Sequence, residues 1–268
     1  MPDPRNRYYT GISTLIGFHD LLGYGDLLAV SGGTLDSAAG EIARLRVEGL
    51  SKSLANARPT FPDGTRFFHL NDSAVAFLDV DVSMGAAHTE ASAIEGWIAD
   101  TDVMATMARF VSACAILHGA SISREETEKL GPAGRTFVVL GQRWAVAASD
   151  VDQVPPLQAN VAFAEAYLAD QLGSRAGFTH RPSENVYLND FLWFQLSNSH
   201  GRFSPEQQTA LDSIGPVDQD FPTNLRAEGE PIEVSIFHRK RRFYSIVAVN
   251  ACEIGAALDA GDVGTVAR

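Results

Sequence analysis

The stretch Ser13–Leu28, STLIGFHDLLGYGDLL, combines an apolar strand, an acidic residue and a turn into a helix. The apolar run Thr14–Phe18 is typical of a strand that enters the core of a sheet. Asp20 follows where this strand is expected to emerge at its carboxyl end, and Gly23 allows a tight turn. A carboxylate in this place either binds a ligand beside the turn or caps the following helix. Both interpretations of Asp20 remain open at this point.

A second acidic residue, Asp72, follows Asp20 by 52 positions. Two strand-like runs, Arg66–Leu70 and Ala74–Val80, flank the segment Asn71-Asp72-Ser73, and this pattern predicts a hairpin. Both aspartates therefore lie at strand ends, so that one sheet edge can hold both. Because two adjacent carboxylates repel each other, such a pair favours the Mg²⁺ or Mn²⁺ that clamps nucleotide phosphates. The alternative for Asp72 is a turn residue that bonds its own backbone.

The other periodic segments predict both helices and strands. Amphipathic spacing predicts helices, and short apolar runs predict strands. The expected helices are Ser37–Ala55, Glu90–His118 (ending at Gly119) and Leu157–Leu172; the expected strands are Ala120–Ser123, Thr136–Leu140 and a hairpin over Ile232–Val249 with a basic tip at Arg239–Arg242.

The segment Gly173–Pro231 is irregular in pattern. Its Pro, Ser, Asn and Gly content predicts loops around a short apolar piece, Asp190–Leu196, and a helix that begins near Ser204-Pro205-Glu206. We expect a single domain over residues 1–268 with its core at about 12–250. The mixture of elements predicts an α+β sandwich in which helices cover one sheet.

The composition excludes several classes of protein. A formal net charge of −12 argues against nonspecific binding to nucleic acid or to an anionic membrane. The sequence has no run of about 18 apolar residues, and its first residues lack the apolar core of a signal peptide. Cys114 and Cys252 have no metal-ligand spacing, which indicates a reduced, cytoplasmic protein.

The two aspartate motifs together resemble those of class III nucleotide cyclases. The segment 17–24, GFHDLLGY, resembles the first metal-binding motif of that family, Phe-x-Asp-Ile-x-Gly-Phe. Asn71–Phe77 resembles the hairpin that carries its second metal-binding aspartate. Leu117–Ile122 resembles a later Arg-Gly-Ala-Ile strand, with His118 in place of arginine, and 158–167 resembles a late helix. The resemblance covers about residues 12–172 and is closest to the pyrimidine cyclases of bacterial anti-phage signalling, which carry Asp-Ile-Leu-Gly-Phe and Ser-Asp-Ser motifs.

This resemblance implies a fold, a reaction and a set of ligands. The fold is a class III cyclase-like sandwich with a central, mostly antiparallel sheet, flanking helices and a head-to-tail homodimer whose interface forms the site. Asp20 and Asp72 are the implied catalytic residues, and with Leu21 they are the implied ligands of Mn²⁺ or Mg²⁺. The ribose 3′-hydroxyl would attack the α-phosphorus of a nucleoside triphosphate and release pyrophosphate.

The chain also departs from the family pattern. The lysine and aspartate (or threonine) that read adenine in adenylyl cyclases cannot be located, and Asn160 is followed four positions later by Ala164 where the family has arginine. Arg124, Arg143 and Arg175 are the candidates for the missing positive charge. Tyr24 is either a contact of the base or a buried aromatic residue. We therefore predict nucleotide contacts at Tyr24, Asn160 and Arg124, and a pyrimidine substrate, UTP ahead of CTP.

Three functions remain open on the sequence alone. The first is a pyrimidine nucleotide cyclase acting in phage defence, with a cyclic-nucleotide effector encoded nearby. The second is a catalytically silent protein of cyclase fold that senses a nucleotide or a partner, and the third is a structural dimerisation module. Two local patterns have a functional and a structural interpretation, and we expect the structural one for each. His19 is either a ligand beside Asp20 or a surface residue. The basic cluster His238–Arg242 either receives phosphates or an acidic partner, or forms a solvated hairpin tip.

Overall fold

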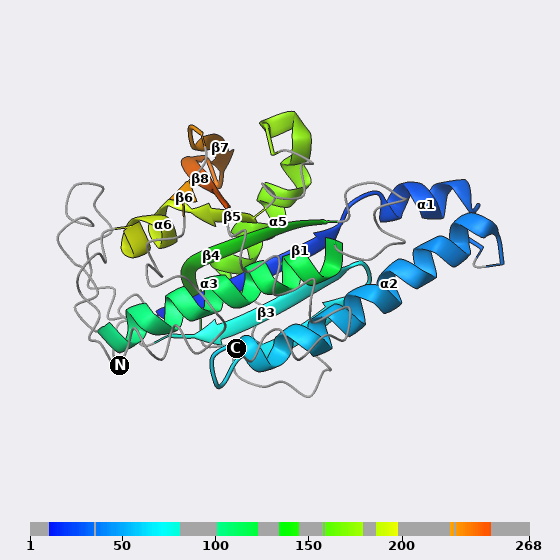
Figure 1. Cartoon of the computed structure of the whole chain (residues 1–268). Helices are drawn as coiled ribbons and strands as arrows, with labels where there is room; N and C mark the ends of the chain where they lie inside the picture. Colours follow the sequence, from blue (N-terminus) through cyan, green and yellow to red (C-terminus); the bar gives the residue numbers. More distant parts are fainter. Residues whose placement is uncertain are drawn as a thin grey trace, which may run out of the picture.

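The computed structural model describes residues 11–34, 36–80, 101–122, 134–144, 157, 159–178, 186–197, 226–227 and 229–247. Its centre is an eight-stranded sheet in the order β2-β3-β1-β4-β5-β8-β6, with β7 paired to β8 (Figure 1). Strands β4 and β5 run parallel, and every other paired neighbour among the described strands is antiparallel. The strands are β1 (Gly11–Leu21), β2 (Arg66–Leu70), β3 (Ser73–Asp79), β4 (Gly134–Trp144), β5 (Val186–Asn189), β6 (Arg226–Ala227), β7 (Ile232–Ile236) and β8 (Arg239–Val247).

Helices cover both faces of this sheet. Helices α2 and α3 lie along one face, where α2 also contacts α3, and α5 packs on β1 and β4 from the other face (Figure 1). The helices of the described residues are α1 (Tyr24–Val30), α2 (Ala38–Ala57), α3 (Thr101–Ile122), α5 (Val161–Leu172) and α6 (Asp190–Ser197), with short 3₁₀ turns at Arg58–Thr60 and Gly173–Ala176. None of them combines the length and the apolar character that a membrane span requires.

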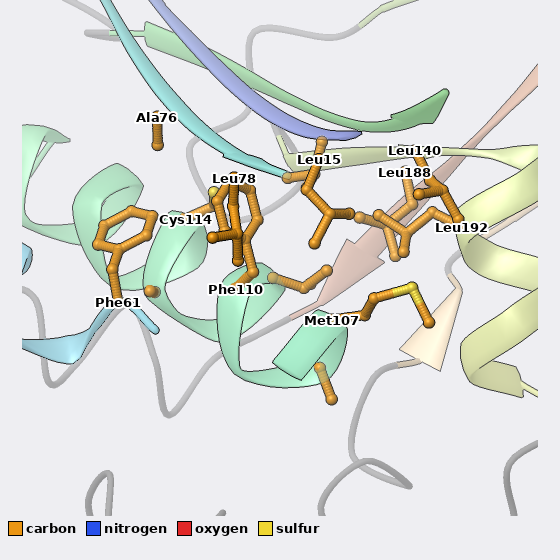
Figure 2. Close-up of a cluster of buried hydrophobic side chains, with 14 of the residues drawn as sticks. Leu15, Phe61, Ala76, Leu78, Met107, Phe110, Cys114, Leu140, Leu188 and Leu192 are labelled. Atoms are coloured by element: carbon orange, nitrogen blue, oxygen red, sulfur yellow. The ribbon is translucent and has the colours of Figure 1, made fainter. Parts of the chain in front are cut away.

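Strand β1 divides the core into two layers because successive side chains of a strand point to opposite faces. Leu15 belongs to the cluster under α3, which Figure 2 shows with Phe110 and Met107 of that helix. Ile16 and Phe18 belong to the cluster under α5. Gly17 lets α3 approach β1 closely, since a Cβ there would meet the sulfur of Cys114. The central strand is therefore buried on both sides and carries its aspartate out of a rigid core.

The strand, turn and helix predicted around Asp20 are confirmed. Gly23 adopts a left-handed conformation with φ of 78° and forms the N-cap of α1. The helix predicted from Ser37 begins at Ala38, because the Ser37 side chain accepts a hydrogen bond from Gly40 N at 3.0 Å. The hairpin of β2 and β3 is confirmed as well, with a two-residue turn in which Asn71 has a φ of 54°.

Helix α3 continues past Gly119 to Ile122, so the strand expected at Ala120–Ser123 is wrong over its helical part. Ala120 is fully buried, and the Ser121 hydroxyl donates to the His118 carbonyl at 2.8 Å. Packing of this last turn outweighs the tendency of glycine to end a helix. The expected start of this helix, at 90–100, lies outside the described residues.

The prediction of a basic tip at Arg239–Arg242 in the closing hairpin is also wrong. The turn is Phe237-His238, with φ of 54° and 58°, and Arg239–Arg242 belong to strand β8. Helix α5 starts at Val161 instead of Leu157, since Asn160 forms its N-cap. The apolar piece Asp190–Leu196 is helical in α6, and the helix predicted near Ser204 lies outside the described residues.

Candidate functional site

A pocket of about 310 Å³ opens at the carboxyl end of β1. It lies where β1, the β2–β3 turn, the start of β4 and the end of α5 come together. Its lining comprises Asp20, Leu21, Leu22, Gly23, Tyr24, Gly25, Asp72, Arg135, Asp170, Gln171, Leu172, Gly173, Ser174 and Arg175.

The sheet register holds Asp20 in place. Asp20 is paired with Ser73 on one side and with Arg135 on the other, so these three residues form one row across three strands. The Ser73 hydroxyl donates to Asp20 Oδ1 at 2.6 Å. Leu21 N donates to the carbonyl of Asp72 at 3.0 Å, which ties the hairpin turn to the end of β1. The two aspartates that the sequence predicted to lie together therefore line one pocket.

Burial raises the pKa of each carboxylate in this pocket, and neighbouring carboxylates add to the rise for Asp20 and Asp170. The pKa of Asp20 rises from 3.8 to about 7, chiefly because of burial and then because of the charge of Asp170; the hydrogen bond from Ser73 and the charge of Arg135 oppose the rise. Burial likewise raises the pKa of Asp72 and that of Asp170. A positive charge placed among these groups would relieve both the desolvation and the repulsion.

The donor chemistry of the pocket fits Mg²⁺ or Mn²⁺, which prefer oxygen ligands. Asp20 and Asp72 offer carboxylates, and Leu21 can offer only its main-chain carbonyl. In the part of the chain that the structure describes, no three His, Cys, Asp or Glu side chains are grouped so as to hold a metal ion. The remaining ligands would have to be substrate oxygens or water, and Mg²⁺ usually keeps several waters.

Arg135 is one of two charged pocket residues, with Asp170, that the sequence did not reveal. It is only 6% exposed, and its Nη2 lies 3.0 Å from Asp170 Oδ1 and donates to the Asp170 carbonyl at 3.2 Å. Its Nε and Nη1 are buried, and within the described part of the chain they have no hydrogen-bond partner. In the sequence, Arg135 stands one residue before the strand expected at Thr136. This position alone does not predict which residue it pairs with.

The other predicted site residues divide into two groups. Tyr24 and Leu21 line the pocket with the two aspartates, and Arg175 lines it as well. Asn160 and Arg143 pair with each other at the ends of α5 and β4 that lie away from the pocket. There Asn160 Oδ1 accepts a hydrogen bond from Phe163 N at 2.9 Å. Arg143 there forms two hydrogen bonds to Asp79, at 2.6 and 2.7 Å.

Arg124 lies outside the described residues. Nucleotide contacts at Tyr24, Asn160 and Arg124 remain predictions.

His19 is fully buried, so its expected place on the surface is wrong. Strand alternation turns it away from the Asp20 face and toward α3, where His118 lies. The Thr136 hydroxyl is 2.7 Å from His19 Nδ1 and 3.1 Å from His118 Nδ1. Burial, with a smaller effect of His118, lowers the pKa of His19 to about 3, so this imidazole is neutral at physiological pH.

The resemblance of Leu117–Ile122, which contains His118, to a strand of the cyclase family is wrong as a structural prediction. This segment forms the end of helix α3. The strand beside β1 is β4, whose second residue is Arg135.

No family model matches the sequence, and no curated protein matches it. Solved structures with a similar chain path include the guanylyl cyclase Cya2, with a TM-score of 0.48 and 9% identity over 89% of this chain and 92% of that one. A bacterial light-regulated adenylyl cyclase has a TM-score of 0.48 and 9% identity over 96% of this chain and 59% of that one. A further structure of such a cyclase has a TM-score of 0.46 and 10% identity. With scores below 0.5, these similarities carry no argument about the activity of this chain.

Proposed function

We propose that the protein is a metal-dependent nucleotide cyclase. It converts a pyrimidine nucleoside triphosphate, UTP ahead of CTP, into a 3′,5′-cyclic nucleotide and pyrophosphate. The observation that carries this proposal is the convergence of Asp20, Asp72 and the buried Arg135 in one pocket at the end of β1. A metal-bound triphosphate requires carboxylates that bind the metal ion and, beside them, a positive side chain that binds the phosphates.

Five pocket residues have a task in this reaction. Asp20, Asp72 and the Leu21 carbonyl would hold Mn²⁺ or Mg²⁺, which when bound neutralises phosphate charge and makes the 3′-hydroxyl more acidic. Arg135 and Arg175 would donate charge-assisted hydrogen bonds to the phosphate oxygens. The 3′-oxygen forms a bond to the α-phosphorus, the bond from that phosphorus to the β-phosphate oxygen breaks, and the hydroxyl proton passes to water. The rigid core behind β1 keeps the carboxylates in place during this displacement.

The assembly and the base belong to the same proposal. Asn160 and Arg143 pair at the start of α5 and the end of β4, whereas the pocket of their own chain lies at the other end of both elements. In a head-to-tail homodimer they would contact the nucleotide in the pocket of the partner. The pyrimidine preference and the role in phage defence, with an effector encoded nearby, rest on the resemblance of the two aspartate motifs. Tyr24, half-buried at the pocket, is the residue that we assign to the base.

Purified protein incubated with each of the four nucleoside triphosphates and Mn²⁺ tests the proposal by chromatography of the cyclic product. We expect product from UTP first, and a loss of at least about 100-fold in Asp20→Asn and in Asp72→Asn. Asp63→Asn is the matched control, because Asp63 is an exposed aspartate before β2 and outside the pocket. Absence of cyclic product from all four nucleotides would rule the proposal out.

A second candidate is a catalytically silent nucleotide sensor of the same fold. It is favoured by Ala164, which stands four positions after Asn160 where cyclases have an arginine. The sensor predicts that a nucleotide raises the melting temperature while no pyrophosphate is released.

A further inference from the structure

The ion pair of Arg135 and Asp170 joins the start of β4 to the last turn of α5 at the wall of the pocket. Its two side chains are 7% and 4% exposed. Both contacts of Asp170 fall on the same nitrogen, since Nη2 faces the carboxylate at 3.0 Å and the main-chain carbonyl at 3.2 Å. No described residue accepts a hydrogen bond from the other two nitrogens of this guanidinium, Nε and Nη1.

Unpartnered N–H groups on two nitrogens of a buried guanidinium are costly, because they have lost water and gained nothing in return. The backbone nevertheless keeps the space beside them open. Gly173 has a φ of 55°, and a Cβ at this position would lie 3.0 Å from Arg135 Nη1. An anionic oxygen that enters the pocket would satisfy these groups with charge-assisted hydrogen bonds.

We infer that Asp170 is a positioning residue, which binds one edge of the Arg135 guanidinium and thereby leaves Nε and Nη1 for the phosphate oxygens of the ligand. The inference rests on the proposed function in taking a triphosphate as that ligand. A free arginine side chain samples many rotamers, and fixing it before the ligand arrives removes an entropic cost from binding. Asp170 supplies this restraint through the ion pair of its Oδ1 with Nη2 at 3.0 Å and through its main-chain carbonyl, which accepts from Nη2 at 3.2 Å.

The negative charge of Asp170 has the opposite effect, because it repels a polyphosphate. The two effects are separable by substitution. Asp170→Asn removes the charge and keeps a side-chain oxygen beside Nη2, whereas Asp170→Ala removes both. If only the charge matters, both variants bind a polyphosphate more tightly than the unmodified protein. If position matters, only the alanine variant binds it more weakly.

Calorimetric titration of the full chain with Mn²⁺ and inorganic tripolyphosphate distinguishes these cases without any turnover. We expect binding to the unmodified protein, a loss of about tenfold or more in Asp170→Ala, and an affinity within about threefold of the unmodified protein in Asp170→Asn. No binding by the unmodified protein, an unchanged or tighter Asp170→Ala, or an equal loss in both variants would overturn the inference. If Asp170→Ala does not fold, Asp170→Ser takes its place, since the serine hydroxyl is too short to reach Nη2.

The matched control is Glu165→Ala on the same helix. Glu165 is 5% exposed and lies 3.3 Å from Arg241 Nε, so Glu165→Ala removes a buried carboxylate from an ion pair outside the pocket. We expect this control to be destabilised while its tripolyphosphate affinity is retained. A loss of affinity in Glu165→Ala equal to that in Asp170→Ala would show a general effect of weakening α5 and overturn the positioning role.

The two proposals can fail separately. If the predicted order of tripolyphosphate affinities is found but no nucleotide is cyclised, the cyclase proposal fails and the positioning role of Asp170 stands. If nucleotides are cyclised and Asp170→Ala binds tripolyphosphate normally, only the positioning role fails.

Discussion

Replacing Asp20 with asparagine should stabilise the metal-free protein at neutral pH, although the change removes a metal ligand of the proposed enzyme. The pKa of Asp20 is raised to about 7 in the folded chain, chiefly by burial and next by Asp170. Between about pH 4 and about pH 7 the folded state keeps a proton that the unfolded state has released, so rising pH favours unfolding over this range. Asparagine has no proton to lose and avoids this penalty.

The magnitude follows from the size of that pH range. The span from 3.8 to about 7, at about 1.4 kcal/mol per pH unit, sets a ceiling of about 4 kcal/mol on the free energy of unfolding. Asp20 is only half-buried, and water at the open pocket screens part of the repulsion. We therefore expect about 2 kcal/mol.

Guanidinium unfolding in the presence of EDTA measures this effect at about pH 4, pH 5.5 and pH 7.5 for both proteins. The advantage of Asp20→Asn in free energy of unfolding should grow between the first and the last pH and then level off. Ser73 can still donate to the asparagine oxygen, so the local hydrogen bond of 2.6 Å need not be lost. A difference that does not change with pH, or one that shrinks as pH rises, would refute the reasoning.

Three further changes test the packing around the site, each by denaturant unfolding. Thr136→Val should lower the free energy of unfolding by about 2 kcal/mol, because both buried imidazoles lose their hydroxyl partner; no loss would show that this network is not stabilising. Gly17→Ala should cost about 1–3 kcal/mol through its clash with the sulfur of Cys114, and adding Cys114→Ala should restore most of it unless the clash lies elsewhere. Ser37→Ala should cost about 1 kcal/mol as α2 loses its cap, whereas Ser37→Asp should keep the cap, and equal losses in both would contradict the capping role.

The pocket was predictable where it depends on short segments of chain. Asp20 lies at the end of an apolar run that is typical of a core strand, and Gly23 supplies the positive φ that the next turn needs. Asp72 sits in a hairpin turn whose residues are typical of such turns. Since β1 and β3 are antiparallel neighbours, the end of one meets the beginning of the other, and two aspartates 52 positions apart become adjacent.

The remaining parts of the site depend on contacts between distant segments. Arg135 and Asp170 are 35 positions apart, and each is unremarkable in its local sequence. They meet because α5 packs across β4 in one register, and no periodicity in either segment specifies that register. His19 was misplaced for the same reason, since alternation alone does not say which face of a strand another helix will cover.

The sequence by itself determined the strand, the turn and the hairpin that carry Asp20 and Asp72, because backbone sterics, caps and apolar spacing act within a few residues. Only the tertiary structure decided that α3 runs through Gly119, that His19 is buried against it, and that Asp170 pairs with Arg135 beside the two aspartates. These outcomes are set by the packing of whole helices onto the sheet, where burial and shape outweigh local preference.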